Sequence, residues 1–500
     1  MKRETEISVG SSSGSLSEAS GGENAAARWA RRGLWALAGA ALLYFVFCFG
    51  DYAFQILRYP IEWDAAEGLA LFQLDHAGRG VSVYGDPEQE PLFIANYPPL
   101  YVWSGLAVSK LTGGGLLPLR LVSLAAALGT ALLIGLGAWR AGARPVWALV
   151  SGLLFLSGPY AGWWLPLARV DSLALFLLVL AFFWADRRPM LSALALVAAT
   201  YTRQTAVLGA VGVAIWYLQG RRFRELLLFS GVAIGVAGAA LALLQWSSGG
   251  WFWHHVVTLN ANRFYPTDAV RYLGGFLATM AGAALVTIGA AAARAPWLRR
   301  EPLGLLIVPG LLNGLLSGKI GAAVNYFLPL QAALALTGAL ALSWLSDRFR
   351  ATALPLALAL ASVLQMVLWG PFDGAFDGPP ESNRAAIAEL EARIEEQGGP
   401  FFLERHVSFA LAAGQPVEYL PMPYKMLELS DSPIDVSAFH RDLESGRYAW
   451  LMVRRGTEGV GEFLDPGSQA LIQSHYRPIG VWTIQDSDRT LKRYNIVVRQ

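Results

Sequence analysis

The sequence is short of charged residues and of cysteine. Asp, Glu, Lys and Arg make up only 15% of its 500 residues, while hydrophobic residues make up 54%. A soluble domain carries about 25% charged residues, so this composition excludes an ordinary soluble protein and indicates a membrane protein. Cys48 is the single cysteine, which excludes intrachain disulfides and thiolate metal cages. The formal net charge of +2 lacks the strong positive field of a nucleic-acid-binding protein.

Motifs for nucleotide chemistry are missing as well. The chain contains no P-loop, no dinucleotide-binding glycine fingerprint and no HExxH zinc motif. The energy for any bond formation therefore has to come from an activated substrate. Six histidines and many carboxylates allow a bound Mg²⁺ or Mn²⁺ without requiring one.

The charges are distributed unevenly along the chain. Residues 371–500 carry 32 of the 76 charged residues, so we expect a soluble domain there. Residues 1–30 are rich in Ser, Gly and Glu and are predicted to form a disordered cytoplasmic tail. Residues 31–370 are predicted to form a polytopic α-helical transmembrane domain. No repeat of fixed period is visible, which argues against a solenoid.

The soluble domain is predicted to be small and of the α/β class. Ser382 is a candidate N-cap for a helix that buries Ile387, Leu390 and Ile394 and ends at 398–400. Three short runs rich in aromatic and β-branched residues predict strands. These runs are 448–453, 480–484 and 494–498.

Eleven apolar segments are candidate membrane spans. Arginine clusters follow alternate segments, and by the positive-inside rule they place those ends in the cytoplasm with the N-terminus. The clusters are Arg140 and Arg144; Arg187 and Arg188; Arg221, Arg222 and Arg224; Arg294, Arg299 and Arg300; Arg348 and Arg350. The segments are 33–57, 119–139, 145–163, 171–185, 190–202, 205–219, 226–246, 272–293, 302–318, 325–345 and 352–370.

The interpretation of two segments, 98–112 and 191–218, decides on which side of the membrane the later segments lie. Residues 98–112 are counted as a re-entrant or interfacial helix in the first outer loop, 58–118, because a full span there would reverse the arginine pattern. The run 191–218 is split at 201–204 into two short helices. With an odd number of spans, the C-terminal domain lies outside the cytoplasm.

Three acidic residues, Asp64, Glu67 and Asp171, fall at the predicted outer edge. Asp64 and Glu67 lie just after the first span, three residues apart, so a helix would place both carboxylates on one face. A partly desolvated carboxylate is a better base near neutral pH, although loop carboxylates can also simply face water. Arg169 and Asp171 open the apolar segment 171–185. Ionisable groups there indicate a functional site, with a helix cap as the simpler alternative for Asp171.

Several outward-facing residues could bind an anion or a sugar. Arg203 lies between two apolar half-helices, where a local anion such as a phosphate would hold it, or where it could snorkel to the interface. Tyr97 lies in the proline-rich turn before 98–112, and the loop 251–265 combines aromatic rings with His254, His255 and Arg263. Adjacent histidines are a weak metal signal, and the aromatic residues also suit an interface belt.

The order of these motifs resembles the GT-C superfamily of integral-membrane glycosyltransferases. The chain is most similar to the bacterial branch that contains protein O-mannosyltransferases and the lipid A aminoarabinose transferase. The resemblance covers about residues 30–345. It is carried, in order, by EWDAAEG, NYPPLYVW, PLRLVS, RVDSLALF and ATYTRQTA.

The resemblance implies transfer of a sugar from a polyprenyl-phosphate donor to a glycan, lipid or protein acceptor on the outer face of the cytoplasmic membrane, usually with inversion. Asp64 matches the loop acid that acts as base or orients the acceptor, Asp171 the second acidic position, and Arg203 the basic residue of a later helix. Two positions depart from the family pattern. Ala65 stands where the family often has Glu after the Asp, and Tyr97 replaces the lysine of the aminoarabinose enzymes, which argues against that particular activity.

Other classes of protein remain open at this point. A transporter or lipid flippase would also have about eleven spans, but it should show inverted repeats and broken helices near the bilayer midplane. Here the carboxylates and arginines gather at one predicted edge. A polysaccharide ligase would share the membrane fold and differ in chemistry.

Overall fold

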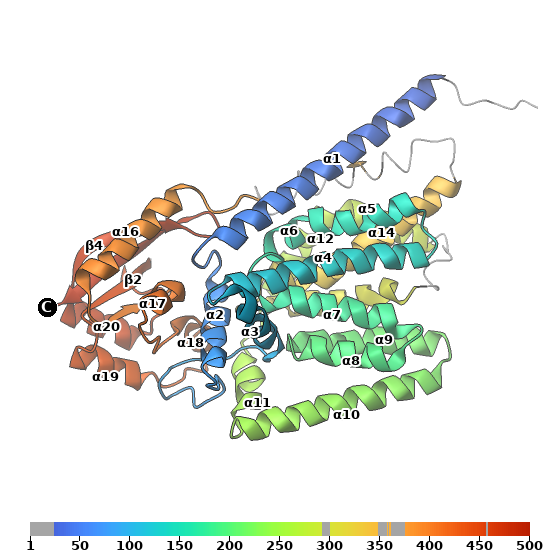
Figure 1. Cartoon of the computed structure of the whole chain (residues 1–500). Helices are drawn as coiled ribbons and strands as arrows, with labels where there is room; N and C mark the ends of the chain where they lie inside the picture. The colour runs from blue at the N-terminus through green and yellow to red at the C-terminus, as the bar shows by residue number, and fades with distance from the viewer. Residues whose placement is uncertain (1–24, 293–300, 349–357, 359, 362–375, 457–458) are drawn as a thin grey trace, which may run out of the picture.

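The computed structural model describes residues 25–292, 301–348, 358, 360–361, 376–456 and 459–500. Apolar helices form an elongated bundle, and the C-terminal domain is stacked on one end of it (Figure 1). Among the described residues, five helices are long and apolar enough to cross a membrane, and five shorter apolar helices accompany them. The chain is a multi-pass membrane protein, as the composition predicts.

The bundle helices match the predicted apolar segments closely. The predicted span 352–370 falls almost entirely outside the described residues. The helices are α1 (Ala25–Arg58), α4 (Leu117–Arg140), α5 (Pro145–Ser157), α6 (Pro159–Trp164), α7 (Val170–Ala185), α8 (Pro189–Thr200), α9 (Gly209–Gln219), α10 (Phe223–Ser247), α12 (Pro266–Ala292), α13 (Ile307–Leu315) and α14 (Leu328–Arg348).

Two boundaries differ from the prediction. α1 begins at Ala25, inside the segment 1–30 assigned to the tail, because the alanine-rich sequence there favours a helix. The predicted span 145–163 is interrupted at Gly158, where α5 ends and α6 begins. Pro159 causes this break, since it has no N–H for the helix and disfavours helical backbone in the preceding residue.

The split of 191–218 into two helices of opposite direction is confirmed. α8 ends at Thr200, and a 3₁₀ turn, η1 (Gln204–Leu208), leads into α9. Near the other end of α9, the Tyr217 hydroxyl donates to the carbonyl of Ala185, the last residue of α7, at 2.7 Å. α9 therefore runs back to the end of the bundle at which α7 finishes.

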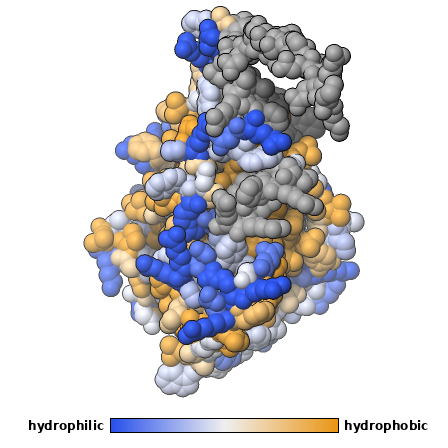
Figure 2. Space-filling model, turned by 90° about the vertical axis from the view of Figure 1, so that its right-hand side faces the viewer, coloured by the Kyte–Doolittle hydropathy of each residue, from blue (hydrophilic) through white to orange (hydrophobic). Residues whose placement is uncertain are grey.

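The end of the bundle away from the C-terminal domain is polar. Hydrophilic side chains gather there, and hydrophobic ones surround them on the flanks (Figure 2). Arg140 at the end of α4 pairs with Glu301 at 2.6 Å, and Arg222 before α10 pairs with Asp186 at 2.9 Å. The two clusters that contain Arg140 and Arg222 thus share one end of the bundle.

The other end of the bundle carries short helices and the C-terminal domain. α2 (Ala65–Gly78), α3 (Leu100–Thr112) and α11 (Trp251–Val256) lie between the long helices and this domain (Figure 1). Pro98 and Pro99 precede α3, and the helix covers the predicted interfacial segment. The predicted loops 58–118, 164–170 and 247–271 therefore meet at one end.

The C-terminal domain is α/β, as predicted. β1 (Phe401–Leu403) pairs in parallel with β2 (Trp450–Gly456), and β5 (Leu491–Arg499) lies antiparallel between β2 and β4 (Tyr476–Gln485). A short strand, β3 (Gly459–Val460), pairs antiparallel with the end of β2. The helices are α16 (Ser382–Gln397), α17 (Val407–Ala412), α18 (Pro421–Glu428), α19 (Ser437–Ser445) and α20 (Pro466–His475).

The prediction of Ser382 as an N-cap is wrong. Ser382 is the first residue of α16, and Glu381 occupies the N-cap position without a capping side-chain bond. The neighbouring Asn383 instead fixes the helix to its surroundings. Its amide donates to the Tyr59 hydroxyl at 3.0 Å and to the Gln485 carbonyl at 2.8 Å. The three core positions of the helix are placed as predicted, since Ile387 and Leu390 are buried and Ile394 packs against the same core.

Candidate active site

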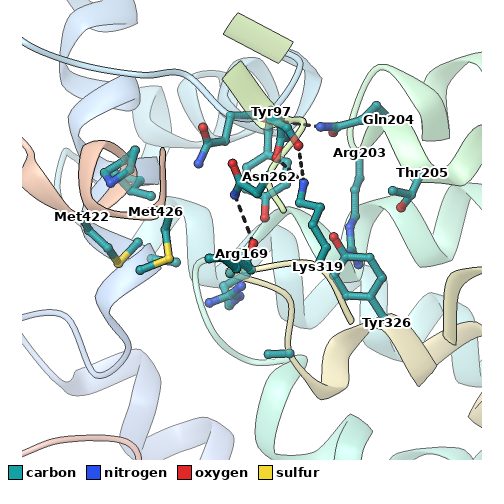
Figure 3. Close-up of a pocket in the computed structure, with 18 of the residues that line it drawn as sticks. Tyr97, Arg169, Arg203, Gln204, Thr205, Asn262, Lys319, Tyr326, Met422 and Met426 are labelled. Atoms are coloured by element: carbon teal, nitrogen blue, oxygen red, sulfur yellow. Dashed lines mark hydrogen bonds between the residues drawn. The ribbon is translucent and has the colours of Figure 1, made fainter. Parts of the chain in front are cut away.

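A cavity of about 430 Å³ lies where the bundle meets the C-terminal domain. Four of the predicted site residues line it: Asp64, Tyr97, Arg169 and Arg203. They come from four separate segments between residues 64 and 203, and the turns at the end of the bundle bring them together. Figure 3 shows the cavity. Its other polar lining residues are Asn96, Gln204, Thr205, Asn260, Asn262, Lys319 and Tyr326.

Asp171 does not line the cavity, but it binds the two arginines on the cationic side of the cavity. The carboxylate lies in the first turn of α7 and is only 2% exposed. Its Oδ1 accepts from Arg203 Nη1 at 2.5 Å and from Asn325 Nδ2 at 2.8 Å. Its Oδ2 accepts from Arg169 Nε at 3.2 Å and from Trp164 Nε1 at 2.9 Å. Asp171 thus holds both arginines, which is more than a helix cap requires.

Arg203 has unused hydrogen-bonding capacity. Its side chain is buried, and its Nε and Nη2 atoms find no hydrogen-bond partner within the described part of the chain. The Tyr326 ring packs against the guanidinium, with 4.3 Å between Cζ and the ring centroid. A buried, unsatisfied N–H group costs about 1–3 kcal/mol, and more when it is charged. An anion that reached the guanidinium would satisfy both nitrogens.

Asp64 faces the same cavity from the start of α2. It is the N-cap of this helix, and its Oδ1 accepts from Ala66 N at 3.0 Å. The same oxygen pairs with Arg169, which therefore bridges the two aspartates of the site. Glu67 completes a capping box with Asp64.

Lys319 provides a second cation beside Arg203 (Figure 3). It follows α13 and lies between two predicted spans. Its Nζ donates to the carbonyl and to the side-chain oxygen of Asn260, at 2.5 and 2.6 Å. Burial, with a smaller contribution from the charge of Arg203, lowers the pKa of Lys319 to about 8. Its charge therefore titrates close to neutral pH.

The C-terminal domain closes the cavity with a thioether wall. Met422, Pro423 and Met426 of α18 line the cavity, and the two methionines lie in Figure 3 on the side away from Arg203 and Tyr326. The domain is joined to the first loop by hydrogen bonds between Leu92 and the segment 418–420, at 2.7 and 3.1 Å. The cavity is therefore cationic on one side and apolar on the other.

The structure places the other predicted site residues outside the cavity. Glu67 is fully buried and pairs with Arg120 at 2.8 Å. Arg263 pairs with Asp431 of the C-terminal domain at 2.7 Å. His255 is buried between the Gly85 carbonyl and the Ala95 N–H, at 2.7 and 3.0 Å, and His254 packs edge-on against Trp251.

The buried environment gives Glu67 and His255 structural roles. Burial would raise the pKa of Glu67, but the charge and hydrogen bonds of Arg120 outweigh it and lower this pKa, so the carboxylate stays ionised. Burial lowers the pKa of His255, which favours a neutral ring that accepts at Nδ1 and donates at Nε2. Neither side chain has an oxygen or nitrogen left for a substrate in the cavity.

Arg120 is one residue that sequence reasoning missed. It lies in the motif PLRLVS, yet no role was predicted for it. Its guanidinium is fully buried and holds the end of α1 through the carbonyls of Ile56 and Ile61, at 2.7 and 2.8 Å. An ionisable residue at the edge of an apolar segment is itself a signal, and applying it to Arg120 would have identified this contact.

The carboxylates of the site do not fit a divalent cation. Arg169 contacts both Asp64 and Asp171, and Arg203 occupies the second oxygen of Asp171. Across the described residues there is no group of three or more His, Cys, Asp or Glu that could hold a metal ion. The charge at this site is therefore balanced by arginine.

No family model matches the sequence, and the search of curated proteins finds no match. Solved structures do match the fold. ArnT from Cupriavidus metallidurans bound to undecaprenyl phosphate superposes with a TM-score of 0.59 at 14% identity, over 93% of this chain and 98% of that chain. The apo state of the same protein gives 0.60 at 14% identity, over 92% and 98%. ArnT is a lipid A aminoarabinose transferase of the GT-C superfamily. The expected resemblance is thus confirmed at the level of the fold.

Proposed function

We propose that this chain, which has the fold of the GT-C membrane glycosyltransferases, transfers a hexose or pentose from a polyprenyl-phosphate donor to an acceptor in the cavity. The observation that carries the proposal is that Nε and Nη2 of buried Arg203 have no hydrogen-bond partner among the described residues. A planar guanidinium is suited to a phosphate, and the structurally similar ArnT binds undecaprenyl phosphate.

The donor phosphate belongs on the cationic side of the cavity. In the reaction the bond between the sugar C1 and the phosphate oxygen breaks, and the phosphate leaves with the electron pair of that bond. Arg203 and Lys319 stabilise the charge that develops on this oxygen. Asp171 holds Arg203 through Nη1, at 2.5 Å, and so orients its two other nitrogens, Nε and Nη2. The polyprenyl chain, being apolar, extends between the helices of the bundle.

The acceptor belongs on the side of Asp64. Its hydroxyl oxygen forms the new bond to C1, and its proton passes to the Asp64 carboxylate. Arg169 holds that carboxylate in place, at the start of a helix whose first turn also lines the cavity. Attack from the side opposite the leaving phosphate inverts the configuration at C1.

The apolar wall of α18 lies on the path of the acceptor. Met422 and Met426 are four residues apart and present two flexible thioethers to the cavity. Methionine side chains adapt to irregular apolar shapes. A glycan, a lipid or a protein side chain can each offer an apolar face next to its hydroxyl group. We place this end of the bundle, with the C-terminal domain, on the outer face of the cytoplasmic membrane, because the arginine clusters that contain Arg140 and Arg222 lie at the opposite end.

The proposal is tested by supplying purified full-length protein in liposomes with a panel of radiolabelled polyprenyl-phosphate sugars. A glycosyltransferase releases polyprenyl phosphate and moves the label to an acceptor or to water. A flippase moves the label across the bilayer and leaves the donor intact. A polysaccharide ligase consumes a donor that carries a preassembled glycan and ignores one that carries a single sugar. Intact donor in every arm would overturn the proposal.

A further inference from the structure

Asp64 lies between two sets of buried contacts, one from the helix bundle and one from the C-terminal domain. On the bundle side, Glu67 Oε2 accepts from the backbone N–H of Trp63 at 2.8 Å, and Arg120 holds Glu67. On the domain side, the two residues that precede Asp64 are both bonded to the domain. The segment that carries Asp64 is therefore held from two directions.

Glu62 makes the stronger of the domain contacts. Its side chain is 4% exposed. Oε1 accepts from the backbone N–H of Ser408 at 3.0 Å, and Oε2 accepts from the Ser408 hydroxyl at 2.5 Å. Both oxygens of Glu62 thus bind one residue of α17. Hydrogen bonds to an ionised carboxylate are roughly twice as strong as those between neutral groups.

The packing around the contact between Glu62 and Ser408 is tight. Gly68 of α2 faces it, and a Cβ atom at this position would meet Glu62 Oε1 at 3.2 Å and Val407 Cγ2 at 3.5 Å. The absence of a side chain at Gly68 lets α17 approach α2 closely. The C-terminal domain therefore rests directly on the first turns of the helix that Asp64 caps.

A second contact holds the residue between Glu62 and Asp64. The backbone N–H of Ser487 donates to the Trp63 carbonyl at 3.2 Å. The adjacent Asp486 is fixed by a buried ion pair with Arg405 at 2.7 Å. Residues 62 and 63 are thus bonded to two different segments of the domain, 405–408 and 486–487.

We propose that Glu62 is a positioning residue of the transfer reaction, and that through Ser408 the C-terminal domain sets the position of Asp64. Glu62 does not line the cavity, so it acts through the backbone that it shares with Asp64. A reacting group displaced by about 1 Å can lose up to about a hundredfold in rate, and the supporting contacts must hold such a group within about 0.5 Å. The inference rests on the proposed function.

The test compares variants of the full-length protein. Ser408→Ala removes the hydroxyl donor to Glu62, and Ser408→Thr keeps it. The matched control is Glu90→Gln, which breaks the ion pair of Glu90 with Arg447, a different contact between the first loop and the same domain, at 2.7 Å. Each variant is measured for kcat and donor KM per folded protein. Hydrogen exchange of the backbone amides of residues 62–68 is measured on the same samples.

We expect Ser408→Ala to lower kcat about tenfold, with donor KM within about twofold, because the donor phosphate is held elsewhere. Exchange at residues 62–68 should rise in this variant. Ser408→Thr should restore both measurements, and Glu90→Gln should change neither. Two results for Ser408→Ala would overturn the inference: unchanged exchange at residues 62–68, or an unchanged kcat together with a lowered thermal stability. Either result would show that the contact between Ser408 and Glu62 is only structural. A wild type that consumes no donor would instead overturn the proposed function, while the exchange comparison still decides whether Ser408 orders the Asp64 segment.

Discussion

Arg203 and Asp171 are 32 residues apart in sequence, and their side chains meet at 2.5 Å at the back of the candidate active site. The ion pair uses one nitrogen of the guanidinium and leaves the other two, Nε and Nη2, without a partner among the described residues. A structural ion pair in a dry environment is usually bonded at all of its donors. We therefore propose that the remaining nitrogens of Arg203 bind the donor phosphate.

Replacing Arg203 should weaken donor binding. Arg203→Gln removes a charged donor to the phosphate, and hydrogen bonds to charged groups are worth about 1.5–3 kcal/mol each. The dissociation constant for polyprenyl phosphate should therefore rise by about ten- to a hundredfold, measured by titration in detergent. Arg263→Gln is the control, because Arg263 pairs with Asp431 outside the cavity. Equal losses in the two variants would contradict the assignment.

Donor binding should weaken as the pH rises through about 8. Burial lowers the pKa of Lys319 to about 8, so the lysine is charged below this pH and neutral above it. An anionic phosphate favours the charged form and should shift the titration upward when it is bound. Measured between pH 7 and 9.5, the affinity of the wild type should fall by about tenfold, and Lys319→Met should bind more weakly at pH 7 and lose this dependence. A wild type with constant affinity across that range would remove Lys319 from the phosphate site.

Glu67 should contribute to stability far more than to the chemical step. Glu67→Gln leaves the buried charge of Arg120 without its carboxylate. Breaking a buried pair from one side costs about 3–5 kcal/mol. The cost should lie near the lower end, since Arg120 still donates to backbone carbonyls of the α1 end. The thermal midpoint in detergent should fall, with activity per folded molecule reduced less than about tenfold. A variant as stable as the wild type but inactive would restore Glu67 as a catalytic residue.

The methionine wall should affect the acceptor and not the donor. Met426→Ala removes apolar contact worth about 1–2 kcal/mol, so the acceptor KM should rise several-fold, while hydrolysis of the donor by water stays unchanged. Lys425→Ala is the matched control on α18, because Lys425 pairs with Glu428 and does not line the cavity. Loss of donor hydrolysis in Met426→Ala would show that this wall supports the donor side instead.

The fold could be predicted largely from the sequence because its signals are local. Apolar runs, arginine clusters and the polar break at 201–204 each report on one helix and its ends. Asp64, Arg169, Asp171 and Arg203 were identified individually in the same way, as ionisable groups at the edges of apolar segments. Their mutual arrangement was not predictable, since it depends on how the loops pack at the end of the bundle.

The predicted site residues that do not line the cavity show what local sequence patterns cannot predict. Arg263 and His255 have the right chemistry for a phosphate, but their partners, Asp431 and the loop at Gly85 and Ala95, lie far away in the sequence. The same holds for Met422 and Met426, which reach the cavity only because the C-terminal domain folds back onto the first loop. Long-range packing decides which of these side chains reach the cavity, and such packing cannot be read directly from a single sequence.

The central claim is that Asp64 and Arg203 face one reaction centre for glycosyl transfer. The most direct test is the rate of polyprenyl-phosphate release by Asp64→Asn and by the wild type, in the same liposomes and with the same labelled donor. Asparagine still caps a helix well, so α2 should remain folded while the proton acceptor is lost. We predict that release falls at least about a hundredfold while binding of polyprenyl phosphate is retained, since general base catalysis contributes about 10²–10⁴ in rate. Release by folded Asp64→Asn at the wild-type rate would contradict the account.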